Sequence, residues 1–130
     1  MCAIEGAEPW DFVHDEQRTA RKTHRCYECD RAIHPGERYH ILTGLYDGRW
    51  STERTCKHCA AAGVWMQRVC GGYLTGGLLE ELVEHWHEGY RSIGLGRLIA
   101  GIRHRWHDGR DAVPEGVSEM ADQMLAAAVA

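Results

Sequence analysis

Two Cys-x-x-Cys pairs carry the clearest chemistry in this sequence, and their residues are Cys26, Cys29, Cys56 and Cys59. A two-residue spacer lets both thiols of a pair point into one tight turn, and two such pairs are the usual ligand set of one tetrahedral zinc ion. Four protein ligands complete the coordination of the ion, so we expect one structural Zn²⁺ and no catalytic metal. A redox-active pair would normally accompany a βαβ pattern, which this sequence lacks.

Two further cysteines, Cys2 and Cys70, stand outside these pairs. We expect both to be buried thiols that behave as small hydrophobic side chains. The alternative is a second metal site, completed by one of three histidines, His14, His85 or His87. His85 and His87 are two residues apart and would therefore lie on different faces of a helix, which argues against their sharing an ion.

The elements that must position the thiols can be read from the residues around each pair. Pro35-Gly36 predicts a turn after the first pair. Residues 38–46 are rich in aromatic and β-branched side chains and predict a strand, Asp47-Gly48 predicts a two-residue hairpin, and residues 49–55 predict the returning strand. The second Cys pair follows this strand at once, and residues 60–69 predict a helix.

This order of zinc knuckle, β-hairpin and helix resembles the treble-clef zinc finger, over residues 24–70. In that family the first Cys pair lies on the knuckle and the second on the first turn of the helix, where the helix dipole stabilises thiolate charge. The resemblance implies an α+β fold, namely a small zinc-binding treble clef with four cysteine ligands and an α-helical C-terminal extension. The expected organisation is an acidic arm with a basic lead-in at 1–23, the zinc module at 24–70, and the extension at 71–130.

The segments outside the zinc module are less regular. Residues 1–17 predict an irregular acidic arm, with Trp10 and Phe12 as apolar anchors, and residues 15–25 fit either a short basic helix or an extended lead-in. Apolar periodicity beyond the module predicts helices at 78–88 and 95–106, and a last helix beginning near Ser118. We expect these helices to pack on the zinc module.

A basic, aromatic-rich face is a candidate for binding nucleic acid. Its charged members are Arg21, Lys22, Arg25, Arg31, Arg38, Arg49, Arg54 and Lys57. Interspersed aromatic side chains, Tyr27, Tyr39, Tyr46 and Trp50, could stack on bases. The whole chain nevertheless has a net charge of −4. A zinc ion with four thiolates adds about −2 to the basic segment, so the positive charge of this segment is lower than that of a dedicated DNA-binding protein.

A nuclease of the His-Asn-His type is a more distant alternative, because these enzymes use a related core with two Cys-x-x-Cys pairs. His40, on the first predicted hairpin strand, could act as the general base. The chain contains no asparagine, however, and Ala60 stands where those enzymes often place a histidine. His58 lies inside the second Cys pair and should point elsewhere. We therefore expect no enzyme activity.

The approach Arg21-Lys22-x-His24, the run from Cys26 to Glu37, and the Asp47-Gly-x-Trp hairpin resemble small cysteine-rich proteins encoded by bacteriophages and prophages. That resemblance implies an accessory protein of the infected bacterial cell that binds or inhibits a host protein complex. Binding of nucleic acid through the basic face is the alternative. His104 and His107, three residues apart on the second predicted helix, are spaced to share a metal, but histidines near a helix C-terminus are common.

The composition favours a cytoplasmic protein with no membrane span. The chain is 44% hydrophobic and 26% charged, which is ordinary for a globular protein. No apolar run approaches the ~20 residues of a membrane-spanning helix, and the N-terminal residues lack the basic and apolar regions of a signal peptide. In a reducing compartment, paired cysteines more often hold metal than form disulfides.

Overall fold

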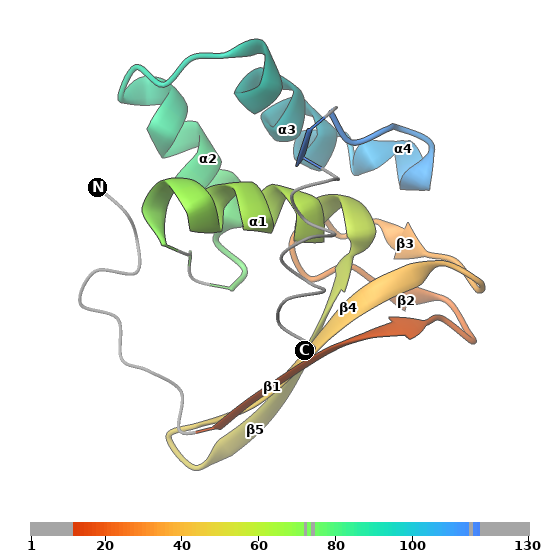
Figure 1. The fold of residues 1–130 in the computed structure, drawn as a ribbon. Coiled ribbons are helices and arrows are strands. Elements are labelled where there is room, and N and C mark those ends of the chain that lie inside the picture. The colour runs from red at the N-terminus through yellow and green to blue at the C-terminus, as the bar shows by residue number, and fades with distance from the viewer. Residues whose placement is uncertain (1–11, 72, 74, 115, 118–130) are drawn as a thin grey trace.

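The computed structural model of the chain describes residues 12–71, 73, 75–114 and 116–117. These residues form a mixed α+β fold, in which a small antiparallel sheet is followed by a layer of helices (Figure 1). The strands come first in the chain and the helices after them. Between the layers lies one buried core.

Three antiparallel strands form the main sheet in the order β1-β4-β5. They are β1 (Phe12–Thr19), β4 (Arg38–Tyr46) and β5 (Arg49–Cys56). The β4–β5 hairpin confirms the two predicted strands, and its turn residues Asp47 and Gly48 both have positive φ, as a tight hairpin requires. β1 corrects the prediction of an irregular arm, because residues 12–17 pair along β4 from Phe12 opposite Leu45 onward.

The reason for this correction is that β1 is specified by its partner and not by its own pattern. Its residues, FVHDEQRT, are mostly polar and show no period of two. Backbone hydrogen bonding to the free edge of β4 does not depend on side-chain type, and it is this pairing that makes the segment extended. The predicted arm residues 1–11 lie outside the described part of the chain.

The two shortest strands, β2 (His24–Arg25) and β3 (Ala32–Ile33), pair with each other on either side of the first Cys pair. This small ribbon forms the predicted knuckle. Gly36 has a φ of +91°, which confirms the turn expected at Pro35-Gly36 and favours glycine at this position.

Four helices follow the sheet in the described residues, α1 (Lys57–Cys70), α2 (Leu78–His87), α3 (Ile93–Arg103) and the short α4 (Trp106–Gly109). α1 begins three residues before the predicted start, because the Cys56 side chain accepts a hydrogen bond from the Cys59 amide and caps it. α3 likewise begins early, where the Ser92 hydroxyl accepts a bond from the Leu95 amide.

The predicted helix over 95–106 is wrong at its C-terminal end. Residues Arg105 to Asp108 all have positive φ, between 44° and 55°, so the chain reverses into a left-handed turn after Arg103. His104 and His107 therefore do not share a helix face, although their rings lie 5.7 Å apart. Trp106, which lies within this turn, is buried. The helix predicted near Ser118 lies outside the described residues.

Close packing at two glycines holds the helices to the core. A side chain at Gly63 of α1 would meet the Tyr73 hydroxyl at 2.5 Å, and one at Gly101 of α3 would meet the Trp106 indole at 2.3 Å. Neither approach leaves room for a Cβ atom. Within the described part of the chain, we found no helix with the length and apolar character needed to cross a membrane.

Candidate metal centre

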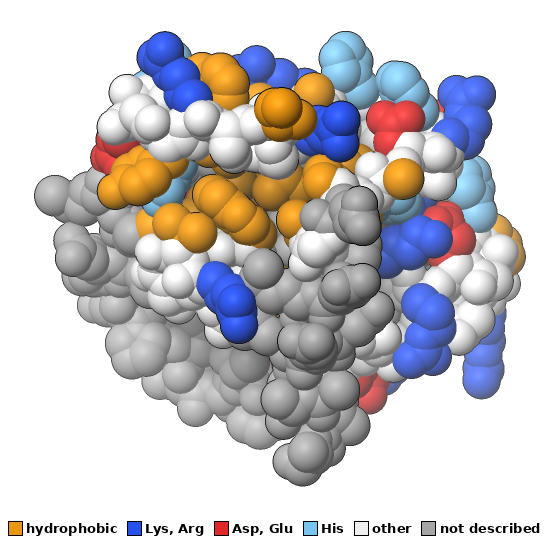
Figure 2. Space-filling view, turned by 45° about the horizontal axis from the view of Figure 1, so that its top comes forward, with side chains coloured by type: hydrophobic (Ala, Val, Ile, Leu, Met, Phe, Trp, Pro, Cys, Tyr) orange, Lys and Arg blue, Asp and Glu red, His pale blue; other side chains and the backbone are white. Residues whose placement is uncertain are grey.

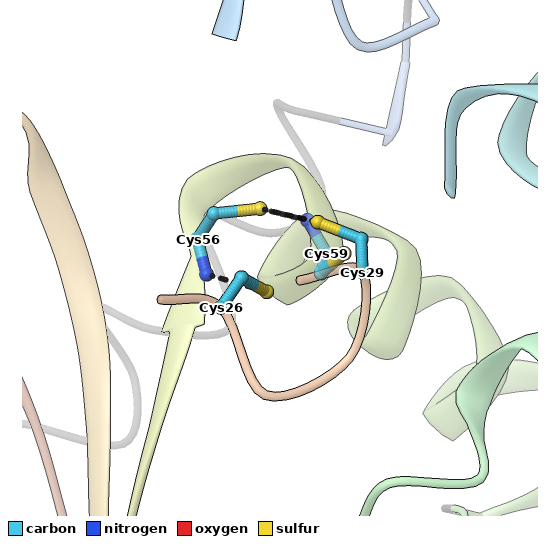
Figure 3. A group of neighbouring side chains, drawn as sticks. All are labelled: Cys26, Cys29, Cys56 and Cys59. Atoms are coloured by element: carbon cyan, nitrogen blue, oxygen red, sulfur yellow. Dashed lines mark hydrogen bonds between the residues drawn. The ribbon is translucent and has the colours of Figure 1, made fainter. Parts of the chain in front are cut away.

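Four elements bring the cysteine thiols together (Figure 3). Cys26 and Cys29 lie on the turn between β2 and β3, Cys56 ends β5, and Cys59 lies in the first turn of α1. All four side chains are buried. The hairpin therefore delivers the second pair to the knuckle, which the sequence spacing predicted.

The sulfur atoms fit a single tetrahedral ion. All four lie within 4.8 Å of one another, and the Sγ atoms of Cys29 and Cys56 are 3.9 Å apart. A tetrahedral zinc ion with Zn–S bonds of about 2.3 Å separates its ligands by about 3.8 Å. The four-cysteine group could thus hold one metal ion, and a set of four thiolates selects zinc over hard cations such as Mg²⁺.

Hydrogen-bond donors surround the sulfurs and stabilise negative charge on them. The Cys56 amide donates to Cys26 Sγ at 3.3 Å, and the Cys59 amide donates to Cys56 Sγ at 3.4 Å (Figure 3 marks bonds within the group). Burial opposes ionisation of Cys56, but hydrogen bonds from its three neighbouring thiols outweigh burial and hold the pKa of Cys56 far below its usual value.

A buried arginine adds positive charge beside the cluster. Arg31 is 0% exposed, and its guanidinium donates to both carboxylate oxygens of Glu37, at 2.8 and 3.2 Å. Although burial opposes its charge, the hydrogen bonds to Glu37 and the nearby Cys56 raise the pKa of Arg31. Arg31 thus offsets part of the net charge of about −2 on a zinc ion with four thiolates.

Trp106 connects the metal centre to the C-terminal helices. Its indole Nε1 donates a hydrogen bond to Cys59 Sγ at 3.4 Å, and its ring packs 5.0 Å from the His58 ring. The His58 imidazole in turn donates from Nε2 to the Asp111 carbonyl. The left-handed turn at 105–108 is what aims Trp106 inward at the sulfur, and the burial of this large ring compensates for the strained backbone.

Glu28, inside the first Cys pair, connects the knuckle to α2. Its carboxylate accepts hydrogen bonds from the Gly76 amide at 2.9 Å and from the Leu78 amide at 3.2 Å. These are N–H groups at the start of α2, where negative charge is favoured. Burial nevertheless raises the pKa of Glu28, against the effect of the two amides. Sequence reasoning missed both Glu28 and Trp106, since neither spacing nor periodicity signals a contact so distant in the chain.

A second cluster joins Cys70 with Glu81 and His85. Cys70 Sγ lies 2.8 Å from His85 Nε2, and His85 Nδ1 donates to the Glu81 carbonyl at 3.0 Å. The structure thus brings together Cys70 and His85, two of the residues that the sequence analysis named for a second metal site. His85 is buried and His87 is exposed, so the two histidines point in different directions. Cys70 is half-buried and disulfide-bonded, which corrects the prediction of a buried free thiol. A disulfide sulfur is not available as a thiolate ligand, and Glu81 makes a further interaction, so these contacts do not define a metal site.

The eight basic candidates do not form one uniform face. Arg31 is buried against Glu37, which corrects its assignment to a phosphate-binding surface. Arg25 donates to the Asp30 carbonyl, Arg38 contacts Thr19, and Arg54 is half-buried. Six of the eight are exposed, namely Arg21, Lys22, Arg25, Arg38, Arg49 and Lys57. Of the aromatic candidates, Tyr39 is in the core, whereas Tyr27 and Trp50 are exposed.

The histidines considered for a nuclease have other partners. The His40 imidazole on β4 contacts the Asp15 carboxylate of the adjacent strand β1. His58 is buried against Trp106 and points away from the protein surface. His40 and His58 therefore do not converge on an exposed metal site between them in the described structure.

Comparisons with known proteins give no relative for this chain. No protein-family model matches it, and no match was found among the curated proteins or among the solved structures. The four buried cysteines are therefore what the sequence and the structure together establish about its chemistry.

Proposed function

We propose that this chain is a non-catalytic binding protein stabilised by one structural zinc ion in a treble-clef arrangement. The observation that supports this proposal is the closed donor set of Cys26, Cys29, Cys56 and Cys59, which leaves no coordination position for a substrate. The contacts of Trp106 and Glu28 link this site to the helices, so the metal would hold the helical layer in place. Zinc binding then contributes directly to the free energy of folding.

The leading version is a protein that binds a partner protein through its helical layer. Large apolar side chains are exposed there, with Ile93 77% exposed, Tyr90 60% exposed and Val69 44% exposed. Aromatic and aliphatic anchors of this kind are typical of protein interfaces. In line with the resemblance to phage-encoded proteins, the proposed partner is a host protein complex that the chain binds or inhibits.

The second version is binding of nucleic acid through the strand side. Tyr27 and Trp50 are 54% and 64% exposed, and a hollow of about 530 Å³ beside the knuckle is lined by His24, Arg25, Tyr27 and Arg54. Exposed aromatic rings beside arginines favour stacking on bases. The same hollow also contains Asp30 and Glu53, whose charges oppose a phosphate backbone, and we therefore rank this version second.

Affinity purification of the zinc-loaded chain from a bacterial lysate tests the proposal. We would compare untreated samples with samples treated with nuclease and with about 0.5 M salt, at which charges are screened beyond ~4 Å. A discrete protein partner that survives both treatments supports protein binding. Loss of all bound material, together with nucleic acid in the untreated eluate, refutes the leading version and supports the second.

A further inference from the structure

An apolar groove lies between α2 and α3. Its volume is about 440 Å³, which falls within the usual size of a ligand-binding cavity. Val83 and Trp86 of α2 and Ile99 of α3 form its apolar walls. Figure 2 shows hydrophobic side chains gathered on the helical side of the molecule, with Lys and Arg side chains around them.

Small residues on α3 create this groove. Gly96 and Ala100 both line it and are four residues apart, so they lie on the same face of the helix. Because neither has a long side chain, α3 leaves open space opposite the Trp86 indole of α2. Exposed Ile93 stands one turn before Gly96 and extends the apolar surface beyond the groove.

The polar residues of the groove are one arginine and two histidines. They are His87 of α2, Arg103 at the end of α3, and His104 directly after it. No carboxylate belongs to the described lining, and no ion pair among the described residues involves Arg103 or His104. The nearby acids Glu84 and Glu88 lie outside the groove and make interactions of their own.

We propose that the groove between α2 and α3 binds an acidic amphipathic segment of a partner protein. Apolar side chains of the segment enter between Trp86 and Ile99, and its carboxylates meet Arg103 and His104. An apolar groove between two helices suits the helix-in-groove mode of recognition, and the basic rim selects a segment of opposite charge. This inference rests on the proposed protein-binding function and assigns it a surface and a partner chemistry.

The test selects binders from a displayed library of random peptides about 12 residues long, enough for about three helical turns. The full-length zinc-loaded chain is the bait, and its Ala100→Leu variant, which fills the groove from an exposed helix position, is the counter-bait. Selected peptides are then measured by fluorescence anisotropy. Zinc content and circular dichroism establish that each variant keeps its fold.

We expect the selected peptides to combine large apolar residues with Asp or Glu. Ala100→Leu should weaken their binding by at least about 10-fold, as filling an anchor pocket does. Arg103→Glu should weaken it by about 3- to 10-fold, because a rim ion pair becomes a repulsion. The matched charge reversal Arg21→Glu, at an exposed position before the knuckle, should change it by less than about 2-fold.

Any of four outcomes would overturn the inference. The first is that no peptide is enriched over the Ala100→Leu counter-bait. The second is that enriched peptides are basic or bind Arg103→Glu as tightly as the original chain. The third is a concentration-dependent dimer that Ala100→Leu abolishes, which assigns the groove to a second copy. A lysate partner that still binds both groove variants would leave the proposed protein-binding function standing and refute the groove alone.

Discussion

Replacing Trp106 with phenylalanine tests whether the C-terminal helices support the metal centre. The substitution keeps an aromatic ring in the core but removes the indole N–H that donates to Cys59 Sγ at 3.4 Å. A hydrogen bond to a charged group contributes about 1.5–3 kcal/mol. The bond is strongest when Cys59 is a metal-bound thiolate, so most of the loss should appear as weaker zinc binding. Since 1.4 kcal/mol is about a factor of 10, we expect zinc affinity to fall about 10- to 100-fold.

The assay is competition for zinc between the protein and a chromophoric chelator. The matched control is Trp86→Phe, because Trp86 lines the groove and contacts Gly96 and Arg91 rather than a zinc ligand. The smaller ring at position 106 also leaves a cavity beside Gly101, worth about 1–2 kcal/mol of stability. Both variants should therefore melt at lower temperature, but Trp106→Phe alone should lose zinc affinity. Equal zinc affinity in the two variants would refute the role assigned to the indole N–H.

Three further predictions concern the contacts around the metal. Chelation should remove one zinc ion per chain, measured by metal analysis, and should disrupt the helices seen by circular dichroism; an unchanged melting curve would contradict a structural zinc. Glu37→Gln should lower the free energy of unfolding by about 3–5 kcal/mol, because buried Arg31 loses its charged partner. Burial opposes ionisation of Glu37, but hydrogen bonds from Arg31 outweigh burial and lower the pKa of Glu37 below 4.5. The ion pair therefore adds its full stability above the unfolded-state pKa of Glu37, and this stability is lost as the pH falls through the lower, folded-state pKa. The difference in free energy of unfolding between the original chain and the variant, measured by denaturant titration, should shrink over this pH range. A difference that grew would refute the ion pair. Glu28→Ala should cost about 1–2 kcal/mol by leaving the amides of Gly76 and Leu78, at the start of α2, without an acceptor, and should raise amide exchange at Leu78; exchange that stays unchanged would contradict this cap.

The metal centre and the hairpin that carries it were predictable because their signals are local. A Cys-x-x-Cys spacer, an Asp47-Gly48 turn and alternating strand residues each constrain the chain within a few positions. The strand β4 accordingly has the predicted bounds Arg38–Tyr46. The start of α1 differed only because a cysteine side chain can cap a helix, and sequence rules assign that role to Ser, Thr, Asp or Asn.

The errors concern segments whose conformation depends on distant partners. β1 is extended because it pairs with β4, and its own polar sequence gives no period that would reveal this. The helix predicted through Trp106 ends at Arg103 because the indole turns inward to Cys59. In both cases a tertiary contact overrode a local preference, which periodicity cannot register.

The sequence by itself determined the four cysteines of the candidate metal centre, the hairpin between the two pairs and the presence of helices after it. Only the tertiary structure decided what surrounds the sulfurs: Arg31 in the core beside Cys56, Trp106 on Cys59, and Glu28 at the start of α2. The physical reason is that coordination spacing and turn chemistry act over a few residues of chain. Hydrogen bonds to a buried thiolate and the groove between two helices depend on how separate elements pack, and that packing is a property of the whole fold.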